Sequence, residues 1–335
     1  MEESPSKTLW LSDEQVQDLL TPDEAYAAVA NALACHARGD FQQPLKPYIR
    51  PKGREQERTG GRFIAMPAYL GGDLQAAGLK WIAGFPANIE KGLPRASGLM
   101  ALNSTETGRL LALMPCETLS ARRTAAIAAL SFDHLAPPPP RKVAVIGAGP
   151  IGRSVLEALV SHPERGIVEA RLCDLRRQRA EEAVHLLSGI SLPPVRIFTD
   201  AQSCVQDAEV VVTATTGSRD YLQNEWLSRG RLLVALSLDD CKPEVLLSSD
   251  KVVVDDFDQC CREEKLLHRL VQERRFSRER IAATLGEIIN GTKTGRTQAS
   301  ENIYVNPMGM AIEDVAVAQT VFRKALREHI GIFLP

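Results

Sequence analysis

The chain has 335 residues, of which 44% are hydrophobic and 24% are charged, and its formal net charge is −2. This composition is typical of a soluble globular protein long enough for two domains, and it excludes a disordered or membrane-embedded chain. The near-neutral charge provides no overall electrostatic footprint for nucleic acid.

The cysteines, the histidines and the first residues of the chain indicate the state of the thiols, the presence of metal and the cellular location. The seven cysteines form no Cys-x-x-Cys pair, so we expect reduced thiols, most of them buried. The six histidines never fall at the close spacings that build a metal site on one helix face, and we therefore predict no metal. No basic stretch followed by an apolar run opens the chain, so we expect the cytoplasm and no membrane partner.

The N-terminal part of the chain predicts a helix followed by strands. Thr21-Pro22-Asp23-Glu24 contains an N-cap, a proline at the first helical position and a glutamate at the capping-box position. Apolar runs separated by Gly, Pro and Asn then predict strands over 63–66, 78–82, 98–102 and 110–114. An Ala-rich helix is predicted over 120–131.

One lysine in these predicted strands is unusual. Lys80 interrupts the apolar run from Ala77 to Phe85. A charged side chain in such a strand needs a partner or a function, because burying an unpaired charge is costly.

A spacer of four prolines, Pro137 to Pro140, precedes the most informative stretch of the chain. The spacer predicts a domain boundary. The β run Val143 to Ile146 then leads directly into Gly147-Ala148-Gly149-Pro150-Ile151-Gly152, with a helical pattern behind it. In this pattern Gly147 permits a tight turn, Gly149 lets backbone N–H groups approach a pyrophosphate, and Gly152 allows close packing of helix on strand.

An acidic residue after the next strand favours NAD as the cofactor. Asp174 follows the predicted strand 169–173 and is placed to accept both hydroxyls of an adenosine ribose. The neighbouring Arg176 and Arg177 leave NADP open, since a guanidinium at this point holds a 2′-phosphate in other proteins.

Further short strands alternate with helical patterns, at 195–199, 209–215, 231–237 and 251–255. This alternation predicts an α/β fold with a doubly wound parallel sheet of the Rossmann type. The loops Thr213-Ala214-Thr215 and Ser237-Leu238 end two of these strands, and we expect them to flank the nicotinamide. A C-terminal helix over 309–329 has an apolar face that we expect to pack on the first domain.

Several strings occur in an order that resembles the ornithine cyclodeaminase/mu-crystallin family: Lys80-Trp81-Ile82, Arg95-Ala96-Ser97, Thr107-Gly108, Ser120-Ala121-Arg122-Arg123-Thr124-Ala125-Ala126, the glycine motif and Gly309-Met310-Ala311-Ile312-Glu313-Asp314. Shorter strings, 43–50, 64–69 and 80–86, look most like the bacterial branch that makes 2,3-diaminopropionate. The resemblance implies a substrate-binding and dimerisation domain (1–136 plus 307–335) with an inserted Rossmann domain (137–306), and a homodimer.

The resemblance also implies roles for individual residues. Arg50, Lys80 and Arg123 hold a substrate carboxylate, with Met66 beside the substrate, and guanidinium forks suit that task. Lys80 is also expected to be catalytic, because it helps to fix the carboxylate so that the C–H bond points at the cofactor. Arg123 has an alternative, structural role as a helix arginine paired with an acid. The nucleotide contacts implied in addition to the three glycines are Ala148, Pro150, Ile151, Asp174, Thr124, Thr213, Ala214, Thr215, Ser237, Leu238 and Gly309.

Asp240 matches the family's catalytic aspartate, next to the substrate amine. Cyclodeaminases read Gly-Gly-Asp-Cys-Pro-Gly-Lys here, whereas this chain reads Leu238-Asp239-Asp240-Cys241-Lys242-Pro243, and Ala65 stands where they carry a glutamate. Both departures argue against ornithine cyclisation. The simpler alternative for Asp240 is an exposed loop acid without a catalytic role.

The expected activity is NAD-dependent oxidation of a secondary amine in an N-linked amino-acid conjugate. The diaminopropionate branch uses N-(2-amino-2-carboxyethyl)-L-glutamate, which gives 2,3-diaminopropionate, 2-oxoglutarate and NADH. A substrate that yields 2-oxoglutarate carries more than one carboxylate, so the pocket needs further cations to bind them. Arg50, Arg95 and Lys46 are candidates. Two alternatives are a cyclodeaminase or ketimine reductase acting on another amino acid, and a non-catalytic nucleotide-dependent binding protein.

Overall fold

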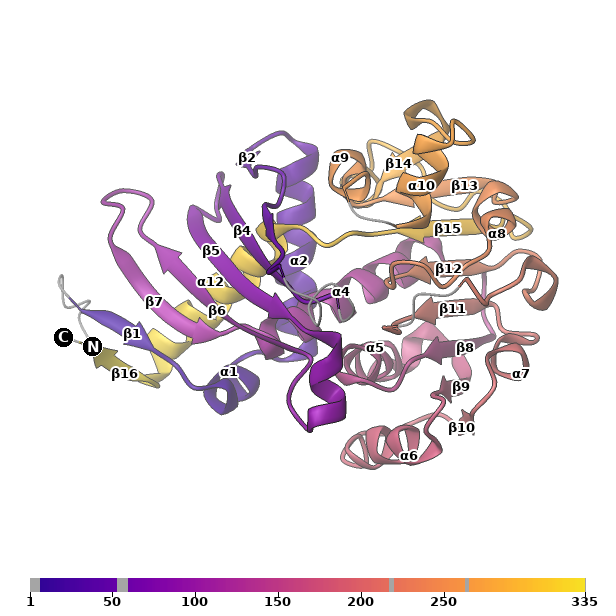
Figure 1. Cartoon of the computed structure of the whole chain (residues 1–335), viewed down its shortest axis with the longest axis horizontal. Helices are drawn as coiled ribbons and strands as arrows, with labels where there is room; N and C mark the ends of the chain where they lie inside the picture. Colours follow the sequence, from indigo (N-terminus) through magenta and orange to yellow (C-terminus); the bar gives the residue numbers. More distant parts are fainter. Residues whose placement is uncertain (1–6, 53–59, 217–219, 263–264, 335) are drawn as a thin grey trace. The chain divides into compact units, whose positions relative to one another are not determined.

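A computed structural model describes residues 7–52, 60–216, 220–262 and 265–334. The chain divides into two compact units (Figure 1). Unit 1 comprises 1–123 and 310–335, and unit 2 comprises 124–309. The division after residue 123 falls inside a helix, α4 (Glu117–Leu135), and not at the proline run where the sequence predicts it. The four prolines follow the end of α4, and the chain passes from one unit to the other within that helix.

Unit 1 is built on a mixed, mainly antiparallel sheet in the order β16-β1-β7-β6-β5-β4-β2, with β3 paired to β4. Its strands are β1 (Thr8–Trp10), β2 (Phe41–Gln42), β3 (Tyr48–Ile49), β4 (Arg62–Leu70), β5 (Ala76–Gly84), β6 (Ala96–Asn103), β7 (Leu110–Pro115) and β16 (Ile332–Leu334). The helices are α1 (Asp13–Leu19), α2 (Pro22–Ala37), the start of α4 and α12 (Ala311–Glu328), with a 3₁₀ turn over Pro86–Lys91. The four strands predicted in this region are confirmed, and each is longer than predicted, by between one and five residues.

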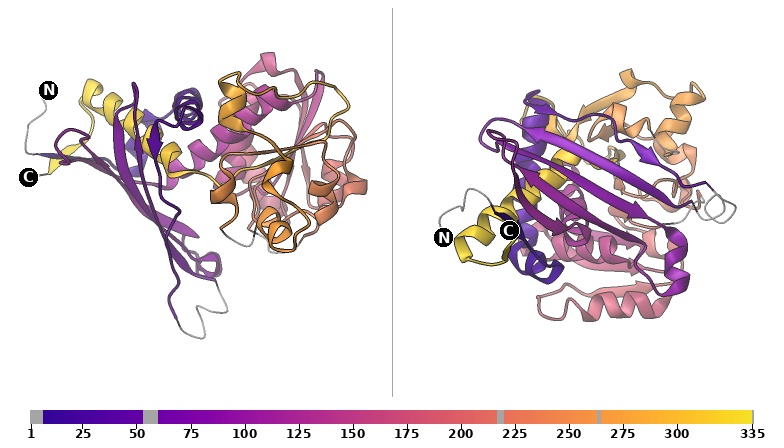
Figure 2. Two further views of the ribbon diagram at one scale, coloured as in Figure 1. Left: turned by 90° about the horizontal axis from the view of Figure 1, so that it is seen from above. Right: turned by 60° about the vertical axis from the view of Figure 1, so that its left-hand side comes forward.

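Local sequence signals place the helices of unit 1. Thr21 caps α2 with the predicted capping box, in which its hydroxyl accepts from Glu24 N and the Glu24 carboxylate accepts from Thr21 N. The helix α12 packs against α2 and the strands β4, β5 and β6, on one side of the sheet (Figure 2). The predicted packing of the C-terminal helix on the N-terminal part of the chain is therefore confirmed.

The register of the sheet explains how Lys80 becomes buried. Lys80 on β5 stands opposite Met66 on β4 and Met100 on β6, and directly opposed residues share a face. All three side chains are buried. Their neighbours Leu79 and Trp81 point to the other face, where they are 37% and 39% exposed.

Unit 2 is a parallel sheet in the order β10-β9-β8-β11-β12-β15-β13-β14. Its strands are β8 (Arg141–Ile146), β9 (Ile167–Cys173), β10 (Val195–Phe198), β11 (Val210–Thr213), β12 (Leu232–Ala235), β13 (Lys251–Val254), β14 (Ile281–Thr284) and β15 (Ile303–Asn306). Its helices, after the end of α4, are α5 (Pro150–Val160), α6 (Arg177–His185), α7 (Ala201–Val205), α8 (Pro243–Leu247), α9 (Phe257–Cys260), α10 (Leu266–Gln272) and α11 (Leu285–Ile289). The predicted doubly wound Rossmann sheet is confirmed, and the sequence prediction missed only its short strands β14 and β15 among the described residues.

The central strands of unit 2 are buried. Strands β11, β12 and β15 consist entirely of buried residues, as expected for a parallel sheet covered on both faces. Of the seven cysteines, six are buried and Cys261 is half-buried, and all are free thiols, as the sequence predicted. Within the described residues, no helix combines the length and apolar character needed to cross a membrane.

Candidate active site

The glycine turn after β8 has the geometry that a dinucleotide requires. Gly147 has a φ of +106°, and a Cβ there would lie 2.5 Å from the Ala214 carbonyl oxygen. A Cβ on Gly152 would lie only 1.7 Å from the Gly147 carbonyl oxygen. Gly149, by contrast, has nothing within 4 Å of the place where its Cβ would be. The first and third glycines therefore allow close packing, and the second leaves room for a ligand beside the backbone.

The helix that follows offers an anion site. Gly149 is the N-cap of α5, it makes no side-chain cap hydrogen bond, and Pro150 begins the helix. The first turn of α5 contains no acidic residue. Backbone N–H groups and the positive end of the helix dipole thus face a position where a pyrophosphate binds in such folds.

Asp174 lies directly beside this turn, at the end of β9. Its Oδ2 accepts a hydrogen bond from Ala148 N at 3.0 Å, and its Oδ1 accepts one from Arg176 N at 2.9 Å. Arg177 instead pairs with Glu181 on α6 at 2.8 Å. The donor set, a glycine turn with a fixed carboxylate after the second strand, fits an adenine dinucleotide with an unmodified ribose.

The two loops predicted at the carboxyl end of the sheet do meet. Strands β11 and β12 are parallel neighbours, and Thr215 N donates to Ser237 Oγ at 2.7 Å. Thr213 is the last residue of β11 and is completely buried, and its carbonyl accepts from Ser237 N. The Leu238 carbonyl accepts from Leu266 N, which anchors this loop to α10.

Asp240 is a buried carboxylate, 3% exposed, at the end of the second loop. The Thr215 hydroxyl donates to its Oδ1 at 2.7 Å, and the Tyr221 hydroxyl donates to its Oδ2 at 3.2 Å. Burial raises the pKa of Asp240, while these hydroxyls oppose that rise. Its neighbour Asp239 is held by Arg269 at 2.9 Å. The alternative of an exposed loop acid is therefore wrong for Asp240.

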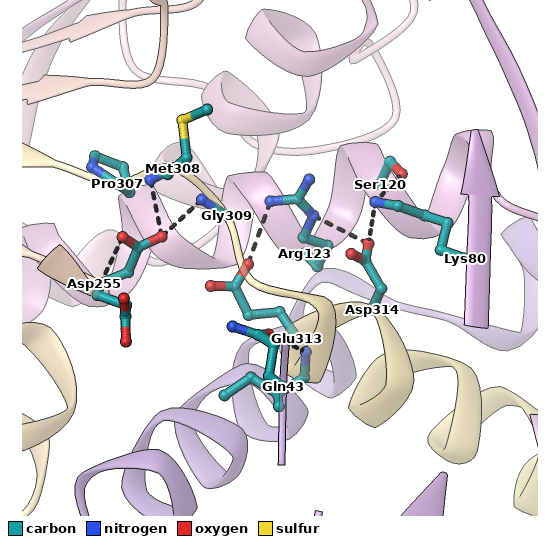
Figure 3. A network of polar contacts seen from close by, with 12 residues as sticks. Gln43, Lys80, Ser120, Arg123, Asp255, Pro307, Met308, Gly309, Glu313 and Asp314 are labelled. Carbon is teal, nitrogen blue, oxygen red and sulfur yellow. Dashed lines mark hydrogen bonds and ion pairs between the residues drawn. The ribbon is translucent and has the colours of Figure 1, made fainter. Parts of the chain in front are cut away.

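A second cluster, in unit 1, surrounds Lys80. Its Nζ donates to Asp314 Oδ1 at 2.7 Å and to Ser120 Oγ at 3.2 Å, and the side chain is 2% exposed (Figure 3). Arg123 donates from Nε to the same Asp314 oxygen at 3.2 Å and from Nη1 to Glu313 Oε2 at 3.2 Å. The expectation that Lys80 has a partner is confirmed, and so is the pairing of Arg123 with acids.

The remaining predicted substrate residues lie in the same unit. Met66 is buried beside Lys80 in the sheet. Arg50 is exposed and stacks over the Tyr48 ring at 5.1 Å. Lys46 is 5% exposed, and its charge lowers the pKa of Asp314. Arg95 is half-buried near Arg62, and burial lowers its pKa.

Gly309 and Thr124 are two further predicted nucleotide contacts. Gly309 has a φ of +73°, and its N–H donates to Asp255 Oδ2 at 2.6 Å (Figure 3). Thr124 is buried in α4, one residue after Arg123. Both assignments remain predictions.

Sequence reasoning assigned no role to Tyr221, Glu313 or Asp314, although the two acids belong to the family string 309–314. The sequence does mark the two acids, because adjacent carboxylates interrupt the apolar run Ala311 to Ala318. In the structure both side chains are completely buried. No sequence pattern marks Tyr221, since a single tyrosine 19 residues before Asp240 matches no recognisable motif spacing. Gln43 is the first residue of the string 43–50, and the sequence indicated no separate role for it. Its side-chain oxygen accepts a hydrogen bond from Ile312 N at 3.0 Å, which satisfies one N–H group at the start of α12.

Comparisons with known proteins identify the family of the chain. The family model described as "Ornithine cyclodeaminase/mu-crystallin family" matches residues 6–329. The chain is 36% identical to N-((2S)-2-amino-2-carboxyethyl)-L-glutamate dehydrogenase of Staphylococcus aureus, over 92% of this chain and 91% of that protein. It is 34% identical to an alanine dehydrogenase of Archaeoglobus fulgidus, over 97% of both.

Solved structures show the same fold. An archaeal alanine dehydrogenase dimer with bound NAD has a TM-score of 0.86 at 32% identity, covering 98% of this chain and 99% of that one. The Δ(1)-pyrroline-2-carboxylate reductase of Thermococcus litoralis, in complex with NADH and L-proline, has a TM-score of 0.88 at 27% identity, covering 97% and 99%. The chain therefore belongs to the ornithine cyclodeaminase/mu-crystallin family.

Proposed function

We propose that this chain oxidises the secondary amine of an N-linked amino-acid conjugate, with N-(2-amino-2-carboxyethyl)-L-glutamate as the substrate. At the coarser level the chain is an NAD-dependent oxidoreductase of its family, as its dehydrogenase and reductase relatives indicate. The observation that carries the proposal is the burial of Asp240 between two hydroxyl donors at the end of the parallel sheet.

Gly149, the start of α5 and Asp174 would hold the cofactor, at its pyrophosphate and its adenosine ribose. When bound, NAD supplies the acceptor for a hydride from the substrate. The raised pKa of Asp240 suits a general base, because a base is most effective when its pKa approaches the working pH.

In the proposed reaction the glutamate Cα–H bond breaks with loss of a hydride, and the amine nitrogen gives its proton to Asp240. A C=N bond forms between that carbon and nitrogen. Asp240 then assists addition of water to the imine, and cleavage of the C–N bond releases 2-oxoglutarate and 2,3-diaminopropionate. Thr215 and Tyr221 keep both carboxylate oxygens of Asp240 oriented throughout.

Lys80 and Arg123 are proposed to bind a substrate carboxylate. A lysine ammonium has three N–H donors, and the contacts with Asp314 and Ser120 use two of them. The described cluster also includes Lys46, so that three cations surround the two carboxylates of Glu313 and Asp314. An anionic ligand would balance the excess positive charge in this buried region.

The relatives support two candidate substrates in addition to the conjugate. One named relative acts on alanine and another on pyrroline-2-carboxylate, so a ketimine or amino-acid reductase remains the second candidate. The conjugate is preferred because a relative that is 36% identical to this chain carries that activity in its name, and because Ala65 and Lys242 depart from the cyclodeaminase pattern.

We also propose a homodimer formed through the exposed face of the unit 1 sheet. Trp81 stacks on Phe63 with ring centroids 5.7 Å apart, and Trp81 and Leu79 expose apolar surface on a central strand. Exposed apolar surface of this kind is typical of protein interfaces. A related alanine dehydrogenase is described as a dimer.

Replacing the proposed base tests the function directly. Asp240→Asn keeps the shape of the side chain and removes its basicity, so turnover should fall at least 100-fold. Binding of NADH, measured by fluorescence titration, should change less than about threefold, because Asp240 is not assigned to cofactor binding. Turnover at the wild-type rate would remove Asp240 from the mechanism.

A further inference from the structure

Asp314 joins two cations that come from separate elements. Its carboxylate lies in the first turn of α12, and its side chain is completely buried. The single oxygen Oδ1 accepts from Lys80 on β5 at 2.7 Å and from Arg123 on α4 at 3.2 Å (Figure 3). These two cations are the ones assigned above to the substrate carboxylate.

The surroundings of Lys80 make it depend on this acid for its charge. Burial lowers the pKa of Lys80, and the charge of Arg123 lowers it further, whereas Asp314 raises it. The other groups that face the ammonium are the neutral Ser120 hydroxyl and the Cys116 thiol, whose own pKa burial raises to about 12. Glu313 contacts Arg123, and Lys46 acts on Asp314. Asp314 is thus the carboxylate in direct contact with Lys80.

The position of the acid also fixes where the cations point. Bonds to one oxygen hold the Lys80 ammonium and the Arg123 guanidinium edge within a few ångströms of the same point. Gln43 in turn fixes the start of α12 through Ile312 N at 3.0 Å, so the helix turn that carries Asp314 is itself anchored.

We propose that Asp314 is a positioning residue for substrate binding, which orients Lys80 and Arg123 so that both can bind one substrate carboxylate. This inference rests on the proposed function, in which Lys80 and Arg123 bind that carboxylate. Asp314 itself does not contact the reacting atoms in this account. Its removal should therefore weaken substrate binding more than it slows the chemical step.

The test compares Asp314→Asn with the wild-type protein from pH 6 to pH 9, at saturating NAD and with the conjugate as substrate. Without the acid, Lys80 loses its proton at a lower pH, so the KM of the variant should rise with pH. We expect KM at least tenfold above wild type at pH 8, approaching the wild-type value at pH 6, with kcat changed less than about threefold. A merely structural role would lower stability without producing this pH dependence.

Two controls isolate the effect. Glu24 lies on α2 and pairs at 2.7 Å with Lys324, which lies on α12 like Asp314. Glu24→Gln removes the charge of this acid and should leave KM unchanged at every pH. Asp314→Glu retains the charge but displaces it, so KM should rise equally across the pH range. This second variant also keeps the inference testable if the asparagine variant does not fold.

The outcomes separate the two claims. Absence of conjugate oxidation by the wild type would contradict the proposed function and this inference with it. Wild-type turnover together with an Asp314→Asn KM that does not vary with pH would contradict the role of Asp314 alone. An unchanged KM in Asp314→Glu would contradict the orienting part of the role.

Discussion

The Thr215 hydroxyl donates a 2.7 Å hydrogen bond to Asp240, and this contact joins the loops that end the neighbouring strands β11 and β12. Tyr221 donates to the second carboxylate oxygen. The acid is therefore buried and oriented at both oxygens, which is the arrangement expected of a base that must meet a substrate in one geometry.

Removing the Tyr221 hydroxyl should move the pH dependence of activity. The hydrogen bond from Tyr221 stabilises the charged form of Asp240 and lowers its pKa. In Tyr221→Phe the pKa of Asp240 should rise, so the acid limb of the kcat profile should move to higher pH. A pH profile of kcat measures this shift, and Tyr69→Phe, on β4 in the other unit, is the matched control. An unmoved limb in Tyr221→Phe would show that Asp240 does not set the acid limb.

The two glycines at the start of α5 should respond differently to alanine. Gly149→Ala introduces a methyl group with no neighbour within 4 Å, so stability should change by less than about 0.5 kcal/mol. The same methyl group should obstruct the pyrophosphate and weaken NADH binding at least tenfold. Gly152→Ala places its Cβ 1.7 Å from the Gly147 oxygen and should destabilise the protein by about 2 kcal/mol or more.

Urea unfolding and NADH titration of both glycine variants provide the measurements. Normal NADH affinity in a folded Gly149→Ala protein would argue against a pyrophosphate at this turn.

Asp174 should set the preference for NAD over NADP. Its carboxylate is fixed by two backbone N–H groups, and it should accept the ribose hydroxyls of NAD and repel a 2′-phosphate. Asp174→Ala should lower kcat/KM for NAD by roughly 10- to 100-fold, the effect of losing hydrogen bonds to a charged group, and should narrow the discrimination against NADP. Glu182→Ala, on the nearby helix α6, is the control. A wild-type preference for NADP would contradict this assignment.

Charge introduced on the exposed sheet face should disrupt the proposed dimer. Trp81→Arg places a cation on the apolar face of β5, whereas Leu186→Arg places one at a 62% exposed position in unit 2. Light scattering coupled to size exclusion should give a dimer mass for the wild type and for Leu186→Arg, and a lower mass for Trp81→Arg. A wild-type monomer would refute the dimer.

Features encoded by neighbouring residues could be predicted from the sequence. The capping box at Thr21 and Glu24 and the strand–glycine–helix pattern at Gly147 to Gly152 depend on spacing along the chain, and both have the expected geometry. The carboxyl-edge loops followed from the rule that parallel strands present their ends together.

Features that depend on tertiary pairing could not be predicted in the same way. The partner of Lys80 lies 234 residues later in the chain, and no local pattern connects β5 with α12. Strands β14 and β15 have four residues each, and β14 consists of Ile-Ala-Ala-Thr, in which the two alanines have weak β propensity. The division between the units falls within α4, where no break in the sequence pattern marks it, and the proline run follows at the end of this helix.

The most direct test of the proposed activity is to follow NAD reduction at 340 nm with a panel of substrates: N-(2-amino-2-carboxyethyl)-L-glutamate, other N-linked amino acids, alanine, ornithine and proline. We predict NADH formation with the conjugate, together with stoichiometric 2-oxoglutarate and 2,3-diaminopropionate. Reduction of NAD by alanine or proline but not by the conjugate would contradict the proposal, as would conversion of ornithine without net reduction of NAD.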